Sequence, residues 1–218
     1  MIVHDTARVK QVATPEHDMP VRPRHVNRVD KRSVQAIESG SRVDVWIRGW
    51  RDFKRRTVSG NLRVLVMTQA DGSFDKDGAL TFHFKKQRKI ERCRHLLRRA
   101  GVPFTESAWA ASGSTTIRVP RRVQPLWLSM FSTKTWGTWL FNESPDVFFD
   151  ELPRWDGYWS GPHSIQYGTT NPTNAGIVQA FAHLSGMTAR VLQKNRKGWN
   201  SQFYVNIWTE PGDVHKLS

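Results

Sequence analysis

Two stretches of the sequence end in the same dipeptide: "VLVMTQADG" at residues 64–72 and "FDELPRWDG" at residues 149–157. Each is a largely apolar run of helical length, and each is followed by a strand-like stretch, "ALTFHFKKQ" at 79–87 and "HSIQYGTT" at 163–170, in which apolar and polar residues alternate. Such alternation predicts a strand with one buried and one polar face. A single Asp-Gly pair is a common turn, but its recurrence at matched places predicts an internal duplication.

Each half then continues with a second helix and further strands. Residues 88–101 carry apolar side chains at helical spacing and stop at Gly101, and residues 171–186 do the same and stop at Gly186. The apolar positions are Ile90, Cys93, Leu96 and Leu97 in the first helix and Ile177, Val178, Phe181 and Leu184 in the second. Strands are predicted at 114–120, 188–193 and 201–208. The repeated order is therefore helix, Asp-Gly, strand, helix and strands.

Residue types at the ends of the two Asp-Gly helices predict where these helices begin and end. Ser59 is the expected N-cap of the first helix, and Gly72 ends it. In the second helix, Ser144 is the expected N-cap and Pro145 suits the first turn. Pro153 lacks a backbone donor near the end of this helix, so we expect a kink there.

The composition of the 218-residue chain favours a polyanionic partner. Lysine and arginine number 33 against 19 aspartate and glutamate residues, which gives a formal charge of +14. We expect nucleic acid rather than a membrane, because the chain has neither a long apolar stretch nor a lipidation signal. Cys93 is the only cysteine, which excludes an internal disulfide and a thiolate zinc site, and the N-terminus lacks a signal peptide. An intracellular, reducing location fits these features.

The two Asp-Gly stretches resemble the two signature motifs of a LAGLIDADG homing endonuclease of the two-repeat monomeric type. Residues 82–104 resemble the strand and helix that follow the first motif in that family, and residues 165–189 resemble those of the second repeat. The likeness covers about residues 58–208. It implies an α/β (α+β) fold with two pseudo-symmetric repeats, each with helices packed behind a curved antiparallel DNA-binding sheet.

A second likeness concerns the two ends of the chain. "VATPEHDMPVRPR" at 12–24 resembles the Thr-x-x-His block of an intein splicing domain, with Thr14 and His17 in the matching places, although an ordinary turn with an exposed histidine gives the same pattern. "GDVHKLS" at 212–218 resembles the strand that resumes after an inserted endonuclease. The chain begins after any splicing nucleophile and ends before any terminal His-Asn, so we expect no splicing by the chain alone. The expected domains are an N-terminal extension at 1–55, which is a splicing-domain relic or a DNA-contacting arm, repeat one at 56–125, a linker helix at 126–143, repeat two at 144–210 and a tail at 211–218.

The resemblance implies a metal-dependent site built on the two Asp-Gly pairs. Asp71 and Asp156 are the expected catalytic acids, and with Gly72 and Gly157 they are the expected contacts of Mg²⁺ or Mn²⁺. Because each acid follows a helix, two carboxylates and two negative helix ends meet, and a divalent cation relieves their repulsion. One acid from each repeat suits a double-strand break. The candidates for a basic residue that polarises the attacking water are Lys85, Arg118 and Lys194.

The polar faces of the predicted sheets supply candidate DNA contacts, since Arg and Lys bond guanine and Gln bonds adenine in the major groove. Most Lys and Arg side chains would instead hold phosphates and make the affinity salt-dependent. In repeat one the predicted DNA-binding residues are Thr81, His83, Lys85, Lys86, Arg88, Thr116, Arg118, Arg121 and Arg122. In repeat two they are Gln166, Thr169, Arg190, Gln193, Lys194, Arg196 and Lys197.

The function implied by the resemblance is a site-specific homing endonuclease that binds double-stranded DNA as a monomer, as in intron or intein homing by mobile elements of bacteria and phages. Two alternatives stay open: a catalytically degenerate nucleic-acid-binding protein, such as an RNA maturase or a regulator, and a fragment of a larger intein. Two departures from the family pattern bear on activity. Val66 and Glu151 stand where small residues bring the family's two motif helices together, and Pro153 lies in the second motif.

Overall fold

The computed structural model describes residues 2–5, 10–13, 18–23, 30–33, 35, 43–45, 61–109, 113–195, 201–209 and 215–216. The chain forms two compact units, residues 54–158 and residues 1–53 with 159–218. The predicted cap Ser59, the pair Thr14 and His17, and the predicted DNA contacts Arg196 and Lys197 lie outside the described residues.

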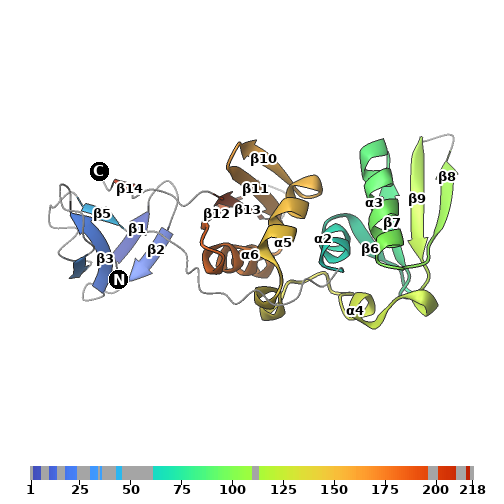
Figure 1. Ribbon diagram of the computed structural model, residues 1–218, viewed down its shortest axis with the longest axis horizontal. Helices are drawn as coiled ribbons and strands as arrows, with labels where there is room; N and C mark the ends of the chain where they lie inside the picture. The colour runs from blue at the N-terminus through green and yellow to red at the C-terminus, as the bar shows by residue number, and fades with distance from the viewer. Residues whose placement is uncertain are drawn as a thin grey trace. The chain divides into compact units, whose positions relative to one another are not determined.

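The unit of residues 54–158 contains one antiparallel sheet with strand order β6-β7-β9-β8 and several helices (Figure 1). Its strands are β6 (Gly72–Phe74), β7 (Leu80–Phe84), β8 (Thr105–Trp109) and β9 (Ser114–Val119). Its α-helices are α2 (Leu62–Asp71), α3 (Gln87–Arg99), α4 (Leu126–Ser129) and α5 (Pro145–Glu151). Its 3₁₀ helices are η1 (Arg121–Val123), η2 (Thr138–Asn142) and η3 (Leu152–Arg154).

The predicted alternation in β7 is confirmed, and it decides which face of this sheet is buried. Leu80, Phe82 and Phe84 are buried, whereas His83 between them is exposed. The helix α3 covers this apolar face with the four residues predicted for it, Ile90, Cys93, Leu96 and Leu97, all of them buried. The opposite face of the sheet is consequently polar. Gly101, which ends the helix, has a positive φ of 65°, a conformation that glycine adopts without steric cost.

The two Asp-Gly helices, α2 and α5, pack against each other within this unit. Seven of the ten residues of α2 are buried, including Val66, which has no exposed surface. The helix α5 begins with Pro145 after Ser144, whose side chain makes no capping hydrogen bond. It gives way to the 3₁₀ helix η3 at Leu152, so the α-helix ends in the turn that contains Pro153.

Residues 126–143 contain two short helices, α4 and η2, instead of one continuous helix. Between them Lys134 adopts a left-handed conformation with φ of 56°, which turns the chain. Leu128, Phe131 and Trp136 are buried, and the ring of Trp136 packs edge-on against Phe148 of α5 at 5.4 Å between centroids. This segment therefore packs against the second Asp-Gly helix.

The other unit contains a second antiparallel sheet whose strand order is β10-β11-β13-β12. The strands are β10 (Gly157–Gly161), β11 (Ser164–Thr169), β12 (Thr188–Lys194) and β13 (Gln202–Trp208). The helix α6 (Pro172–Leu184) packs on this sheet, and the side chain of Asn171 caps it by accepting from the backbone N–H groups of Thr173 and Asn174. Both sheets thus place their first, second, fourth and third strands side by side in that order, with a helix after the second strand. This shared topology confirms the predicted duplication and the α+β fold.

The ends of the chain form two further small sheets in the same unit. The strands β1 (Ile2–Asp5) and β2 (Lys10–Ala13) pair with each other. The second sheet has the order β14-β5-β3-β4, formed by β3 (Asp18–Pro23), β4 (Asp30–Ser33), β5 (Val43–Val45) and β14 (His215–Lys216). The tail therefore pairs with the N-terminal extension. Every helix in the described part of the chain is too short or too polar to cross a membrane.

Candidate active site

Asp71 is the last residue of α2, and its carboxylate is held by a lysine that the sequence analysis did not identify. Lys89 Nζ, from the first turn of α3, lies 2.5 Å from Asp71 Oδ2. The side chains are 26% exposed for Asp71 and 15% exposed for Lys89. A half-buried ion pair of this kind is screened less than a surface pair. The Asp71 carboxylate is therefore held at the C-terminal end of α2.

Asp156 lies just after η3 and is placed within the electrostatic reach of Asp71. Burial and the negative charge of Asp71 raise the pKa of Asp156 to about 6, while the ammonium groups of Lys89 and Lys134 oppose this rise. The structure thus brings together the two acids predicted from the repeated motifs, in one unit of the chain. Two carboxylates that lie near each other repel, and this repulsion makes ionisation of the second one less favourable.

A second lysine completes this cluster. Lys134 Nζ donates a hydrogen bond of 2.7 Å to the carbonyl oxygen of Gly72. Burial lowers the pKa of Lys134, and the nearby charges of Asp156 and Asp71 raise it. Gly72 itself has no room for a side chain, because a Cβ would lie 2.7 Å from the Thr68 carbonyl oxygen and 2.9 Å from Leu80 Cδ1. Close packing between α2 and β7 thus explains the glycine of the first Asp-Gly pair.

Of the three basic residues nominated from the sequence, one is exposed and two contact other groups. Lys85 is exposed beyond the end of β7. Arg118 Nη2 donates to Asp75 Oδ2 at 2.9 Å, in the turn between β6 and β7. Lys194 belongs to the other unit, where its ammonium lies 5.1 Å from the ring centroid of Tyr204. The cations beside the acidic pair are Lys89 and Lys134, from a helix and a linker that no local sequence pattern connects to Asp71.

The donor atoms of the site suit a hard divalent cation. Mg²⁺ prefers oxygen ligands and is commonly held by one or two carboxylates, with water and substrate phosphates completing its shell. Asp71 and Asp156 offer two carboxylates, and their repulsion favours a cation between them. Within the described ranges, no group of three or more His, Cys, Asp or Glu side chains converges on one point. Metal bound here would therefore depend on water and phosphate for most of its ligands. The Gly72 carbonyl, nominated as a metal contact, is bonded to Lys134, and Gly157 opens β10.

The polar face of the first sheet carries predicted DNA-binding residues of repeat one. Thr81 lies opposite Arg118 in the register of β7 and β9, and His83 lies opposite Thr116. His83 Nδ1 and Thr116 Oγ1 are 2.9 Å apart. The other nominated residues of this repeat are all exposed: Lys85, Lys86, Arg88, Arg121 and Arg122. This face combines base-reading and phosphate-binding residue types.

The second sheet has its own polar row across three strands. Gln166 of β11 and Arg190 of β12 both lie opposite Asn206 of the central strand β13. Gln166 Nε2 donates to Asn206 Oδ1 at 2.7 Å. The sequence analysis did not name Asn206, although the alternation in "SQFYVNIW" places it on the polar face. Thr169 ends β11, and the exposed residues Gln193 and Lys194 end β12.

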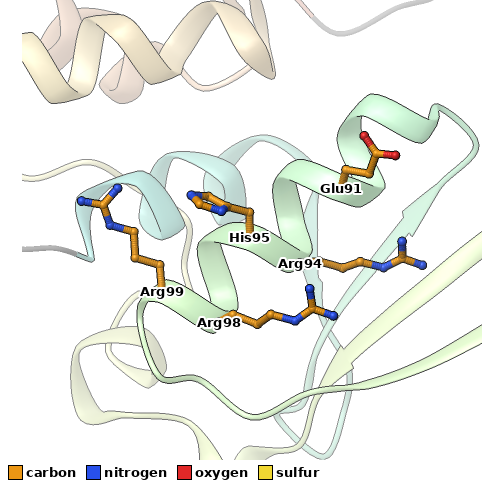
Figure 2. Close-up of a pocket in the computed structure, with 5 residues that line it drawn as sticks. All are labelled: Glu91, Arg94, His95, Arg98 and Arg99. Atoms are coloured by element: carbon orange, nitrogen blue, oxygen red, sulfur yellow. The ribbon is translucent and has the colours of Figure 1, made fainter.

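A surface hollow on α3 lies outside both sets of predicted residues. It is lined by Glu91, Arg94, His95, Arg98 and Arg99, which Figure 2 shows on successive turns of this helix. Arg94 is already committed to a two-contact ion pair with Glu106 of β8, so the positive charge of the hollow is partly neutralised.

No protein-family model and no curated protein matches this chain. Among solved structures, the chain is similar to the N-terminal LAGLIDADG domain of DUF199/WhiA, with 12% identity over 67% of this chain and 74% of that one and a TM-score of 0.43. It is also similar to I-DmoI in complex with DNA and Mn, with 12% identity over 68% and 88% of the two chains and a TM-score of 0.45. For full-length DUF199/WhiA from Thermatoga maritima the identity is 11%, the TM-score is 0.44, and the chain covers 53% of that protein. Identities this low identify neither a ligand nor an activity.

Proposed function

We propose that this protein is a LAGLIDADG-type homing endonuclease that makes a site-specific, metal-dependent double-strand break in DNA. One observation carries the proposal: the chain contains two repeats of the order helix–strand–strand–helix–strand–strand with identical strand order, and an Asp-Gly follows the first helix of each. These first helices, α2 and α5, pack together. The acids Asp71 and Asp156 consequently meet from separate repeats. The net charge of +14 would attract the negatively charged phosphates of a DNA duplex.

Asp71 and Asp156 are the residues that would hold Mg²⁺ or Mn²⁺. A divalent cation supplies charge neutralisation at the scissile phosphate and lowers the pKa of bound water. The chain's own residues do the rest. Lys89 fixes the carboxylate of Asp71, and Lys134 fixes the backbone at Gly72 and adds positive charge beside both acids. The polar faces of the two sheets bind the duplex and select its sequence.

Cleavage of a randomised duplex library tests this proposal, because the library lets the protein select its own target sequence. The full-length protein with Mg²⁺ is expected to cut one long sequence, recovered by sequencing the ligated ends. Asp71→Asn and Asp156→Asn should abolish cutting while retaining binding of the recovered site in a gel shift. Cutting by both variants at the wild-type rate would show that the acidic pair is not the active site.

The proposal has one rival that a specific contact favours. The ammonium groups of Lys89 and Lys134 balance the two carboxylates without any metal, as in a binding protein whose acids are only structural. In that case the protein would select a DNA or RNA sequence and cleave neither. A gel shift that compares duplex DNA with structured RNA, run beside the cleavage assay, separates the two functions.

We also infer that the N-terminal extension and the tail belong to one domain that the endonuclease repeats interrupt. The pairing of β14 with β5 supports this inference, since it joins residues 215–216 to residues 44–45 in one antiparallel ladder. Such an interrupted domain agrees with the likeness of both segments to an intein. Limited proteolysis followed by mass spectrometry should recover the two end segments as one non-covalent complex.

A further inference from the structure

Glu151, the last residue of α5, is a fully buried carboxylate, with no exposed surface. An ionised side chain in that position is costly unless several donors satisfy it. It stands where the LAGLIDADG resemblance calls for a small residue between the two motif helices. Its presence in the interior therefore needs an explanation beyond helix packing.

Three elements supply donors to this carboxylate. Arg63 of α2 donates to Oε2 at 2.7 Å, and Arg92 of α3 donates through Nε to Oε1 at 3.1 Å and through Nη2 to Oε2. The indole Nε1 of Trp155 donates to Oε1 at 2.8 Å. Burial acts to raise the pKa of Glu151, and the bonds from Arg92, Arg63 and Trp155 outweigh it and hold the pKa below its ordinary value. Glu151 therefore stays ionised and joins α2, α3 and the end of η3.

The contacts continue from Trp155 to both acids of the candidate site. Trp155 is 5% exposed and directly precedes Asp156. The ammonium of Lys89 lies 5.6 Å from the centroid of its ring, a cation–π distance. The same ammonium binds Asp71. The indole is thus held on its N–H edge by Glu151 and meets, on its face, the cation that fixes the other acid.

We propose that Glu151 is a positioning residue for the acidic pair: through the Trp155 indole and Lys89 it fixes Asp156 relative to Asp71. This inference rests on the proposed function, because it assigns Glu151 a role at that site. Through its bonds to the two arginines, Glu151 would link the helices where small residues would otherwise let them pack closely. A buried group that only stabilised the helix pair would leave metal affinity unchanged in any variant that folds.

Binding of Mn²⁺ alone to the full-length protein tests the proposal, measured by loss of the electron paramagnetic resonance signal of hydrated Mn²⁺. Removing a group that orients a metal ligand typically weakens affinity by about 10–100-fold. We expect at least a tenfold rise in the Mn²⁺ dissociation constant for Glu151→Gln, and the same for Trp155→Phe, which keeps an aromatic ring but removes the N–H donor. The matched control is Asp150→Asn, because Asp150 contacts the same Arg63 from the surface, and it should stay within about twofold of wild type.

Near-ultraviolet circular dichroism at the assay temperature shows which variants are folded, and Mn²⁺ affinities are compared among those variants only. Trp155→Phe decides the question if Glu151→Gln does not fold, since it leaves both arginines paired with the carboxylate. Wild-type Mn²⁺ affinity in Trp155→Phe, with loss of affinity in Asp71→Asn, would overturn the positioning role and leave the proposed function standing. Unchanged affinity in Asp71→Asn and Asp156→Asn would instead overturn the proposed function itself.

Discussion

Replacing Asp156 by asparagine should stabilise the protein at neutral pH while it removes the proposed activity. Burial and the charge of Asp71 raise the pKa of this carboxyl to about 6 from an ordinary 3.8, so ionising it costs up to about 3 kcal/mol more in the folded protein, at about 1.36 kcal/mol per pH unit. Below pH 3.8 the group is protonated in both states and no cost arises. As the pH rises through about 6 the free energy of unfolding falls by that amount, because the unfolded chain ionises first. Asparagine cannot ionise, so the variant avoids this loss.

Urea unfolding of wild type and Asp156→Asn, in the presence of EDTA at pH 3.5 and pH 7, measures the effect. The two proteins should have similar free energies of unfolding at pH 3.5, and the variant should be more stable by up to about 3 kcal/mol at pH 7. The matched control is Asp77→Asn, the same substitution in the exposed turn before β7. When Mg²⁺ replaces EDTA, it should stabilise the wild type and the Asp77→Asn control but not Asp156→Asn, because a ligand stabilises only a folded state that binds it.

Two results would contradict this reasoning. A variant no more stable than wild type at pH 7 would mean that burial and the charge of Asp71 do not act on Asp156. An equal gain at both pH values would mean that asparagine packs better than aspartate, and that ionisation has no part in the effect.

Three further predictions concern the core and the proposed DNA contacts. Burial raises the pKa of the Cys93 thiol, so Ellman's reagent should react with it only after denaturation, and rapid labelling of the native protein would contradict its place in the core. Leu97→Ala should lower the free energy of unfolding by about 2–5 kcal/mol, as for other fully buried leucines, measured by urea unfolding at pH 7. Arg121→Gln should weaken binding of target and unrelated duplexes equally and make the plot of log affinity against log salt less steep by about 1, whereas loss at the target alone would indicate base contact.

The regular elements of both repeats could be predicted because their signals are local. Alternation in β7 and helical spacing in α3 each depend on neighbours within a few residues, and burial follows the same pattern. The duplication could also be predicted, because the same order of helix and strand patterns occurs twice in the sequence. The end of the α-helix at Glu151 was predictable for the same reason, because a proline disrupts the helical hydrogen bonding of its own turn.

The cations of the site could not be predicted, because their partners are distant in sequence. Lys89 lies on the first turn of α3 among several basic residues, and nothing in that turn marks it as the partner of Asp71. Lys134 itself adopts the left-handed conformation that turns the linker, and because it is not a glycine the sequence gives no sign of this turn. Arg118 was nominated because alternation puts it on the polar face, but the turn that contains Asp75 provides a nearer acid.

The charges around the two acids indicate what a cation would add to a site that already contains two ammonium groups. Lys89 and Lys134 face two carboxylates, so the formal charges of the four groups cancel. Yet the pKa of Asp156 remains raised, which means that burial and the charge of Asp71 outweigh both lysines at that carboxyl. Lys89 Nζ lies 2.5 Å from Asp71 Oδ2, and Lys134 Nζ donates to the Gly72 carbonyl at 2.7 Å while its charge also acts on Asp156. Under the proposed function, a cation bound beside Asp156 would gain from relieving the repulsion that remains there.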